Sequence, residues 1–420
     1  MGTAIVDPLP LYLTSRFAPE LYDRILDNLH DSPSALSACS TVWRSWLPTC
    51  RYHLFSEVVL SQKFATFLRS PANQKVIPFI RKVIINGGWG DPSGKGEEED
   101  MFLLLGGLDN LACLRMDKVV NWETHDLWRS VTLTASGTPL SHRLSSLILR
   151  SVHFPSFSAL ALFISTFFNL RELSMENVTW GGNVAHMEED QLPPLQTSAL
   201  KKLRIASCSF RPIILWIWPG LASGKAIEED HLIPPPLTHL SLPDIFPNEG
   251  DLLGSFLRIL GASLENLEIG FFSHGSDNRD KRDMFSLVDL SYNTELKTIA
   301  CHQVVLFHFP FRAISVTAFQ SFNDPRSPYR WVTDILGTIQ SRKIQQITFH
   351  VWLSAESQLD LINWSALIRI LLSPPLAELR HLRFLVSGIG RDIDLVEVWF
   401  RRRFGQMLPS KAELYVDFSE

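Results

Sequence analysis

The chain has 420 residues, of which 45% are hydrophobic and 20% are charged, and it contains 12 Trp and 27 Phe. A disordered or fibrous protein would be poorer in bulky apolar residues, so this composition predicts a folded chain with ample material for a core. The formal net charge of −5 disfavours a general attraction to nucleic acid or to an anionic membrane. No stretch approaches the roughly 20 apolar residues that a membrane helix needs.

Cysteine usage and the N-terminus indicate the compartment. The five cysteines are odd in number, widely spaced and free of any Cys-x-x-Cys pair: Cys39, Cys50, Cys113, Cys208 and Cys301. This pattern favours buried thiols in a reducing compartment over a disulfide framework or a zinc site. The first residues lack the basic start and long apolar run of a secretory signal. We therefore expect an intracellular protein, cytoplasmic or nuclear or both, with no membrane partner.

After an N-terminal tail (1–16), residues 17–60 predict a module of three short helices. Pro19 and Pro33 each stand where the first position of a helix tolerates proline, and Ser32 can cap the second helix. Helical spacing gives the first helix one apolar stripe, formed by Leu21, Ile25, Leu26 and Leu29. A module of this size cannot bury its apolar surface alone, so it needs the rest of the chain or a partner.

The second and third helices complete the module. Leu36 is expected to face inward from the second helix. The third helix is expected over residues 41–52, with Val42 and Trp46 one turn apart on one face. Pro48 can kink this helix or split it.

These residues, in this order, resemble the F-box in the style common among mushroom-forming fungi. The resemblance rests on Phe17-Ala-Pro-Glu-Leu21, on Leu29-His-Asp-Ser-Pro33 and on Val42-Trp-Arg-Ser-Trp46. It departs from the family at Phe17-Ala18, where Leu-Pro is usual, and at Trp43, where many members have Cys. The resemblance implies docking on the adaptor subunit of a cullin-RING (SCF-type) ubiquitin ligase. It assigns adaptor binding to Pro19, Leu21, Ile25, Leu26, Leu29, Leu36, Val42 and Trp46. The alternative is that the three helices only pack against the following domain and cap it.

A connecting segment (61–79), with a helix at 62–69, leads into a region of repeats (80–420). A hexapeptide recurs there: apolar, two mostly polar, apolar, one variable, apolar. Its ten copies begin at Ile80, Leu111, Leu144, Leu170, Leu200, Leu237, Leu264, Leu296, Ile344 and Leu379. Apolar helical patterns fill several of the gaps, most clearly at 157–168, 252–260, 331–339 and 364–372. A strand and a helix recurring at about 30 residues predict an α/β solenoid with a parallel sheet.

This arrangement is similar to the leucine-rich repeat, and with the first module it resembles the F-box/leucine-rich-repeat proteins. The family's Asn or Cys, three residues after the last apolar position of a strand, is met by Cys208. Elsewhere that position holds Val152, Val178, Ile245, Phe272 and Val304. The long gap between Leu296 and Ile344 implies an insertion or a further repeat near 314–322. A compact α/β domain is the alternative fold.

Four charged or proline-rich stretches predict loops: 87–100, 181–198, 219–236 and 273–283. The acidic runs in these loops are either solvated or a contact surface for a basic partner segment.

Sequence motifs for catalysis are absent. The stretch Trp89-Gly-Asp-Pro-Ser-Gly-Lys-Gly96 fails as a phosphate loop, because Trp89 takes the first Gly position and Gly96 the Ser/Thr position. The histidines are scattered singly, with no zinc-protease or nucleophile-elbow motif. We therefore expect no catalytic residues, cofactor or metal.

The leading hypothesis is a non-catalytic substrate receptor for ubiquitin-dependent protein degradation, with the ligase adaptor and an unknown protein substrate as partners. A repeat-built binding scaffold is the second hypothesis, and an enzyme is the third.

Overall fold

The computed structural model describes residues 18–87, 104–119, 140–181, 199–221, 236–271, 287–302, 330–353, 358–359, 362–388, 393–405 and 412–419. The chain divides into two compact units, Met1–Ser146 and Leu147–Glu420. The N-terminal tail, most of the four predicted loops, the suspected repeat near 314–322 and the positions Phe272 and Val304 lie outside the described residues.

The first unit opens with helices α2 (Pro19–Asp27) and α3 (Pro33–Val42), each beginning at the predicted proline. Ser32 holds the N-cap position of α3, but its side chain makes no capping hydrogen bond. The third helix differs from the prediction. Trp43 adopts an extended conformation (φ −145°, ψ 134°) that ends α3, and a 3-10 turn, η1 (Arg44–Trp46), precedes α4 (Leu47–Phe55).

The position of Pro48 explains where the third helix begins. It lies in the first turn of α4, where a missing backbone N–H removes no helical hydrogen bond. Val42 and Trp46 consequently belong to separate elements, and the prediction that they lie one turn apart on a single helix is wrong.

Each of the three helices contributes a fully buried side chain to the first unit: Leu26, Leu36 and Cys50. Side-chain hydrogen bonds also connect α2 with α4. The Thr49 hydroxyl donates to the Asp23 carboxylate at 2.8 Å, and the His53 ring lies 2.8 Å from the Asp27 carboxylate. The helical module is therefore packed around its own small core.

The helical module continues into a parallel sheet in the order β1-β2-β3. The elements that follow it are β1 (Glu57–Val59), α5 (Gln62–Arg69), η2 (Gln74–Phe79), β2 (Lys82–Asn86), β3 (Cys113–Asp117) and α8 (Leu140–Arg143). Helix α5 spans the predicted residues, and α4 packs against β1 and η2. The first strands and the helical module thus form one unit.

The second unit is built on a parallel sheet whose strands follow chain order. In that order they are β4 (Ser146–Arg150), β6 (Glu172–Glu176), β8 (Lys202–Ala206), β9 (His239–Ile245), β10 (Asn266–Phe271), β11 (Thr298–His302), β12 (Gln346–Trp352), β13 (His381–Ser387) and β14 (Glu413–Ser419). The short strands β5 (His153–Phe154) and β7 (Thr179–Trp180) form a separate pair. The prediction of an α/β fold with a parallel sheet is confirmed.

Helices join the strands of the second unit. They are α9 (Phe157–Ser165), α10 (Phe210–Ile217), α11 (Gly250–Leu260), α13 (Arg330–Leu336), α14 (Trp364–Leu371) and α15 (Ile393–Phe404). Single 3-10 turns occur at η6 (Pro219–Leu221), η7 (Pro247–Glu249), η8 (Gly261–Ser263) and η12 (Pro374–Leu376). Four of the helices occupy the predicted gaps, whereas α10 and α15 were not predicted.

All ten hexapeptides lead into a strand that begins at their third residue. In the seventh copy, for example, Leu264 is buried before the strand, and Leu267 and Ile269 are buried within it. The residues between them, Asn266 and Glu268, point to the other face of the sheet, because side chains alternate along a strand. The hexapeptide therefore sets both the start of each strand and the face that it buries.

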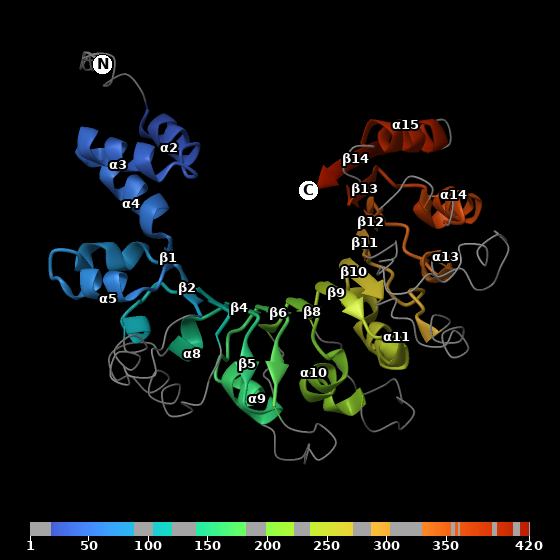
Figure 1. The fold of residues 1–420 in the computed structure, drawn as a ribbon, viewed down its shortest axis with the longest axis horizontal. Coiled ribbons are helices and arrows are strands. Elements are labelled where there is room, and N and C mark those ends of the chain that lie inside the picture. The colour runs from blue at the N-terminus through green and yellow to red at the C-terminus, as the bar shows by residue number, and fades with distance from the viewer. Residues whose placement is uncertain are drawn as a thin grey trace. The chain divides into compact units, whose positions relative to one another are not determined.

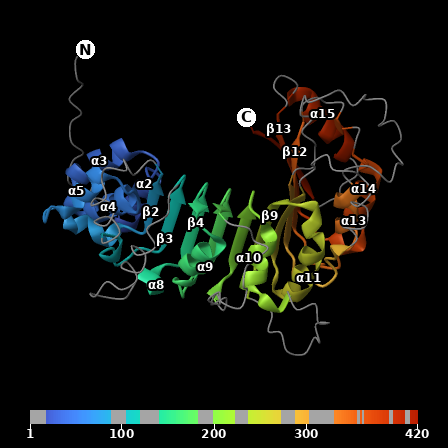
Figure 2. The same ribbon diagram turned by 60° about the horizontal axis from the view of Figure 1, so that its bottom comes forward.

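The two faces of the sheet in the second unit have different neighbours. Its helices, from α9 to α15, lie along one side of the sheet (Figures 1 and 2). No described helix of this unit lies on the other side of its sheet, which we call the open face. From β8 to β14 it includes Lys202, Arg204, His239, Ser241, Asn266, Glu268, Thr298, Ala300, His302, Gln346, Thr348, His350, His381, Arg383, Leu385, Glu413, Tyr415 and Asp417.

A left-handed residue ends four strands at the same place. Lys118, Ser151, Asn177 and Ser207 directly follow β3, β4, β6 and β8 and have φ between 50° and 55°. Within the second unit, the Ser151 N–H donates to Glu176 O at 2.8 Å and the Asn177 N–H to Ala206 O at 2.9 Å. Non-glycine residues rarely adopt positive φ, and these two hydrogen bonds to the next strand stabilise that conformation at Ser151 and Asn177.

We expect Ser156→Ala to lower the free energy of unfolding by about 1 kcal/mol, measured by urea denaturation. The Ser156 hydroxyl accepts a hydrogen bond from the Ala159 N–H at 3.1 Å and so caps α9. Ser165→Ala is the matched control, because that exposed hydroxyl only donates to Leu162 O near the end of the same helix. Equal losses in the two variants would contradict the capping role.

Candidate functional site

The predicted adaptor-binding residues separate into outward and inward groups. Leu21, Ile25 and Val42 are 44%, 55% and 71% exposed. Leu29 and Trp46 are half-buried, whereas Leu26 and Leu36 lie in the core of the helical module; Pro19 begins α2, and its side chain is not among the described ones. The exposed apolar surface of this module also includes Trp43, which is 40% exposed. We call Leu21, Ile25, Val42 and Trp43 the helical face.

An aromatic cluster joins the two parts of the helical face. The Tyr22 ring of α2 lies 5.4 Å from the ring of Trp43, edge to face, and 5.4 Å from that of Trp46. The two Trp rings are 6.0 Å apart. The Trp46 indole N–H is buried and has no hydrogen-bond partner among the described residues. Trp46 therefore packs the turn after α3 against α2. Trp43 contributes more exposed apolar surface than Trp46 does.

The helical face is suited to binding an apolar groove. Leu21 and Ile25 are four residues apart on α2, so their side chains lie on the same side of the helix. Burying such a side chain fully against a partner contributes about 1.5–3 kcal/mol. The carboxylates of Asp23 and Asp27 are bonded to α4 on another side of α2, which keeps Leu21 and Ile25 outward.

A second candidate surface lies on the open face, where five side chains from five strands form what we call the central polar cluster. Its members are Arg204, Ser241, Glu268, His302 and His350. The Arg204 guanidinium donates to Ser241 Oγ at 2.7 Å and to Glu268 Oε2 at 2.9 Å, and the Ser241 hydroxyl donates to Glu268. His302 Nε2 lies 3.7 Å from Glu268 Oε2.

The two histidines of this cluster are stacked. Their ring centroids are 3.8 Å apart and their planes differ by 15°. Burial, together with the neighbouring His350, lowers the pKa of His302 to about 4, against the opposing effect of Glu268. Burial also lowers the pKa of His350. Both rings are therefore neutral at neutral pH, which permits their close stacking.

Ion pairs between neighbouring strands flank the central polar cluster. Lys202 pairs with Glu172 at 2.7 Å, and Arg383 pairs with Asp417 at 2.5 Å. Because these charges compensate one another within the sheet, the open face presents hydrogen-bonding groups without a large field of one sign. Such a surface selects a partner through complementary polar groups and shape.

The cysteines are all free, and three of them are buried: Cys50, Cys208 and Cys301. Burial raises the pKa of the Cys208 thiol to about 11 and that of Cys301 to about 12, so both remain protonated. Cys208 Sγ accepts a hydrogen bond from the Val178 N–H at 3.1 Å and donates to Ala206 O. Cys208 thus links neighbouring strands, while Val152, Val178 and Ile245 fill the equivalent position as buried apolar residues.

The described residues contain no group of three or more His, Cys, Asp or Glu side chains arranged to hold a metal ion. None of the helices in the described part of the chain combines the length and the apolar character needed to cross a membrane. No protein-family model matches the chain, and no curated protein matches it at a significant level.

Proposed function

We propose that this protein is a non-catalytic substrate receptor of an SCF-type ubiquitin ligase. In this proposal the helical face binds the adaptor subunit, and the open face binds a target protein for ubiquitin-dependent degradation in the cytoplasm or nucleus. The observation that carries the proposal is the exposure of Leu21, Ile25 and Val42 on a module whose own core is filled by Leu26 and Leu36. The F-box-like order of these residues supports the same assignment.

Outward apolar side chains favour docking over capping. Helices that served only to cap the sheet would bury their apolar stripe against the strands and present a polar outer surface. Here Leu21 and Ile25 remain exposed although α4 of the same module already packs on β1. Exposed apolar side chains on α2 and at the end of α3, which the Tyr22–Trp43 contact links, are typical of a protein-binding site.

The open face supports the proposed binding of a target protein. Its strands are in register, so each row of side chains continues across the sheet, as in Asn266, Thr298 and Gln346. Repeat arrays with a continuous sheet offer an extended surface to a bound protein. A receptor that holds its target in this way would raise the effective concentration of the target near the ligase. Effective concentrations of tethered partners reach the millimolar range.

Binding of the purified chain to the ligase adaptor tests the proposal. We expect Ile25→Asp to weaken binding at least 100-fold, because a charge would be buried in an apolar interface. Val59→Asp is the matched control: Val59 is an exposed apolar residue of the first unit that belongs to β1 and not to the helical face. Affinity is measured by calorimetry, and circular dichroism checks that each variant is folded.

Two results would overturn the proposal. One is a parent chain that does not bind the adaptor at micromolar concentrations. The other is an Ile25→Asp variant that binds the adaptor as tightly as the Val59→Asp control. Either result would leave a repeat-built binding scaffold, with a helical module that serves its own fold, as the better interpretation.

A further inference from the structure

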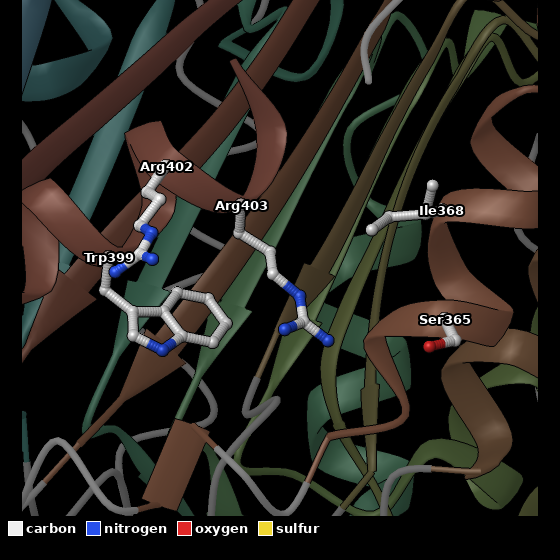
Figure 3. Close-up of a pocket in the computed structure, with 5 residues that line it drawn as sticks. All are labelled: Ser365, Ile368, Trp399, Arg402 and Arg403. Atoms are coloured by element: carbon white, nitrogen blue, oxygen red, sulfur yellow. The ribbon is translucent and has the colours of Figure 1, made fainter. Parts of the chain in front are cut away.

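A cavity of about 690 Å³ lies between α14 and α15 in the second unit. It is lined by Ser365, Ile368, Trp399, Arg402 and Arg403. Figure 3 shows the last three on α15 and the first two facing them from α14. Small-molecule sites are typically clefts of about 300–1,000 Å³ that combine apolar walls with a few polar groups. The cavity has the size and the mixed lining of such a site.

The charged groups described at the cavity are all positive. Arg402 and Arg403 bring two permanent positive charges, and none of the described lining residues is acidic. Neither arginine forms an ion pair with another described residue. Their neighbour Arg401 does, since its guanidinium lies 2.8 Å from the Glu397 carboxylate one turn earlier on α15. Guanidinium groups donate hydrogen bonds and accept none, so the cavity favours an anion rich in acceptors.

Aromatic packing holds one arginine in place. The Arg403 guanidinium lies over the Trp399 ring, 5.8 Å from its centroid. The Trp399 ring itself is 5.0 Å from that of Trp364 and 5.3 Å from that of Phe400, both of which are buried. The core of the second unit therefore positions Trp399, and Trp399 positions Arg403. Because the Arg403 side chain is already held in place, it loses less conformational entropy when an anion binds.

We propose that this cavity binds a phosphate monoester carried on an aromatic or apolar group. Two guanidinium groups match the charge of a phosphate monoester, which is about −1.5 to −2 at pH 7, better than that of a single carboxylate. Trp399 and Ile368 supply the apolar surface against which the organic part packs, and the Ser365 hydroxyl is a further donor. The lining residues belong neither to the helical face nor to the open face, and this proposal does not depend on the receptor function.

Calorimetric titration of the full chain with phenyl phosphate tests the proposal. We expect binding in the submillimolar to millimolar range, at least tenfold tighter than that of benzoate, which has the same ring and a single charge. Arg402→Ala and Arg403→Ala should each weaken binding about tenfold, whereas Arg401→Ala, with its charge already paired to Glu397, should change it less than twofold. Arg403→Lys should recover part of the loss, because lysine keeps the charge without the planar fork.

Two further titrations identify the source of the phosphate. A short peptide containing phosphotyrosine and the nucleotide AMP share the phosphate and the aromatic group. A tenfold preference for one over the other assigns the site to a phosphorylated protein or to a small metabolite. The proposal is overturned if phenyl phosphate does not bind at 10 mM, if benzoate binds equally well, or if the Arg402→Ala/Arg403→Ala double variant binds like the parent.

Discussion

Replacing Phe384 by alanine is expected to lower the free energy of unfolding by about 3–5 kcal/mol, the largest effect of any single substitution considered for the second unit. Phe384 is buried on β13, and its ring centroid lies 4.3 Å from that of Phe400, 5.2 Å from that of Phe349 and 5.2 Å from that of Phe404. These rings come from β12, β13 and α15, so removing the central ring leaves a cavity that no single element can close. Urea denaturation followed by circular dichroism measures the loss.

Leu385→Ala provides the matched control for this substitution. Leu385 is the next residue of β13, but it points to the open face and is only half-buried. We expect Leu385→Ala to lower the free energy of unfolding by about 1 kcal/mol. Similar losses in the two variants would mean that both sides of β13 are equally packed, contrary to the alternation that the sheet requires.

The strands were predictable because alternation and burial coincide in each hexapeptide. The first apolar residue of a copy, such as Leu379, anchors the chain in the core before the strand begins, and the next two, Leu382 and Phe384, face the helices. Two strands of the large sheet, β1 and β14, were not predicted, for different reasons. Phe55-Ser-Glu-Val-Val-Leu60 matches the hexapeptide and leads into β1, but its first residue also belongs to a helix. Before β14, the position of the first apolar residue holds Lys411.

The helices were less predictable than the strands. Helix α10 contains Pro212, which its first turn tolerates, so an apparent helix breaker lies within a helix. The break between α3 and α4 depends on the extended conformation of Trp43, which no local pattern signals. In the folded chain Trp43 and Trp46 contact Tyr22, a residue of a separate element.

The candidate surfaces could be predicted only in part. Helical spacing placed Leu21, Ile25 and Leu26 on one stripe, but it could not tell that Leu26 turns inward while the other two remain exposed. That difference follows from the way α2 packs on α4. The central polar cluster was not predicted, because Arg204 and His350 are distant in the sequence and meet only through the register of five successive strands.

The second large effect is a loss of stability in mild acid, caused by the stacked histidines. The pKa of His302 is lowered from 6.5 to about 4 in the folded chain, so between these values the unfolded chain binds more protons than the folded one. The free energy of unfolding therefore rises with pH through this window. The stability associated with the neutral His302 ring is fully present above pH 6.5 and is lost as the pH falls toward 4. A shift of this size corresponds to about 3 kcal/mol.

Urea denaturation at pH 7.5, 6.0 and 4.5 measures this dependence. In His302→Gln, which does not titrate, we expect the decrease between pH 7.5 and 4.5 to be smaller than in the parent chain by about 2–3 kcal/mol. Charged groups near the two histidines also change their pKa values. Glu268 favours protonation of both rings. Arg204 opposes protonation of both rings, and Arg383 opposes protonation of His350. Glu268→Gln should therefore steepen the loss in acid, because it removes a carboxylate that raises the pKa of both rings. An unchanged pH profile in His302→Gln would show that the stacked pair does not control the acid sensitivity of the sheet.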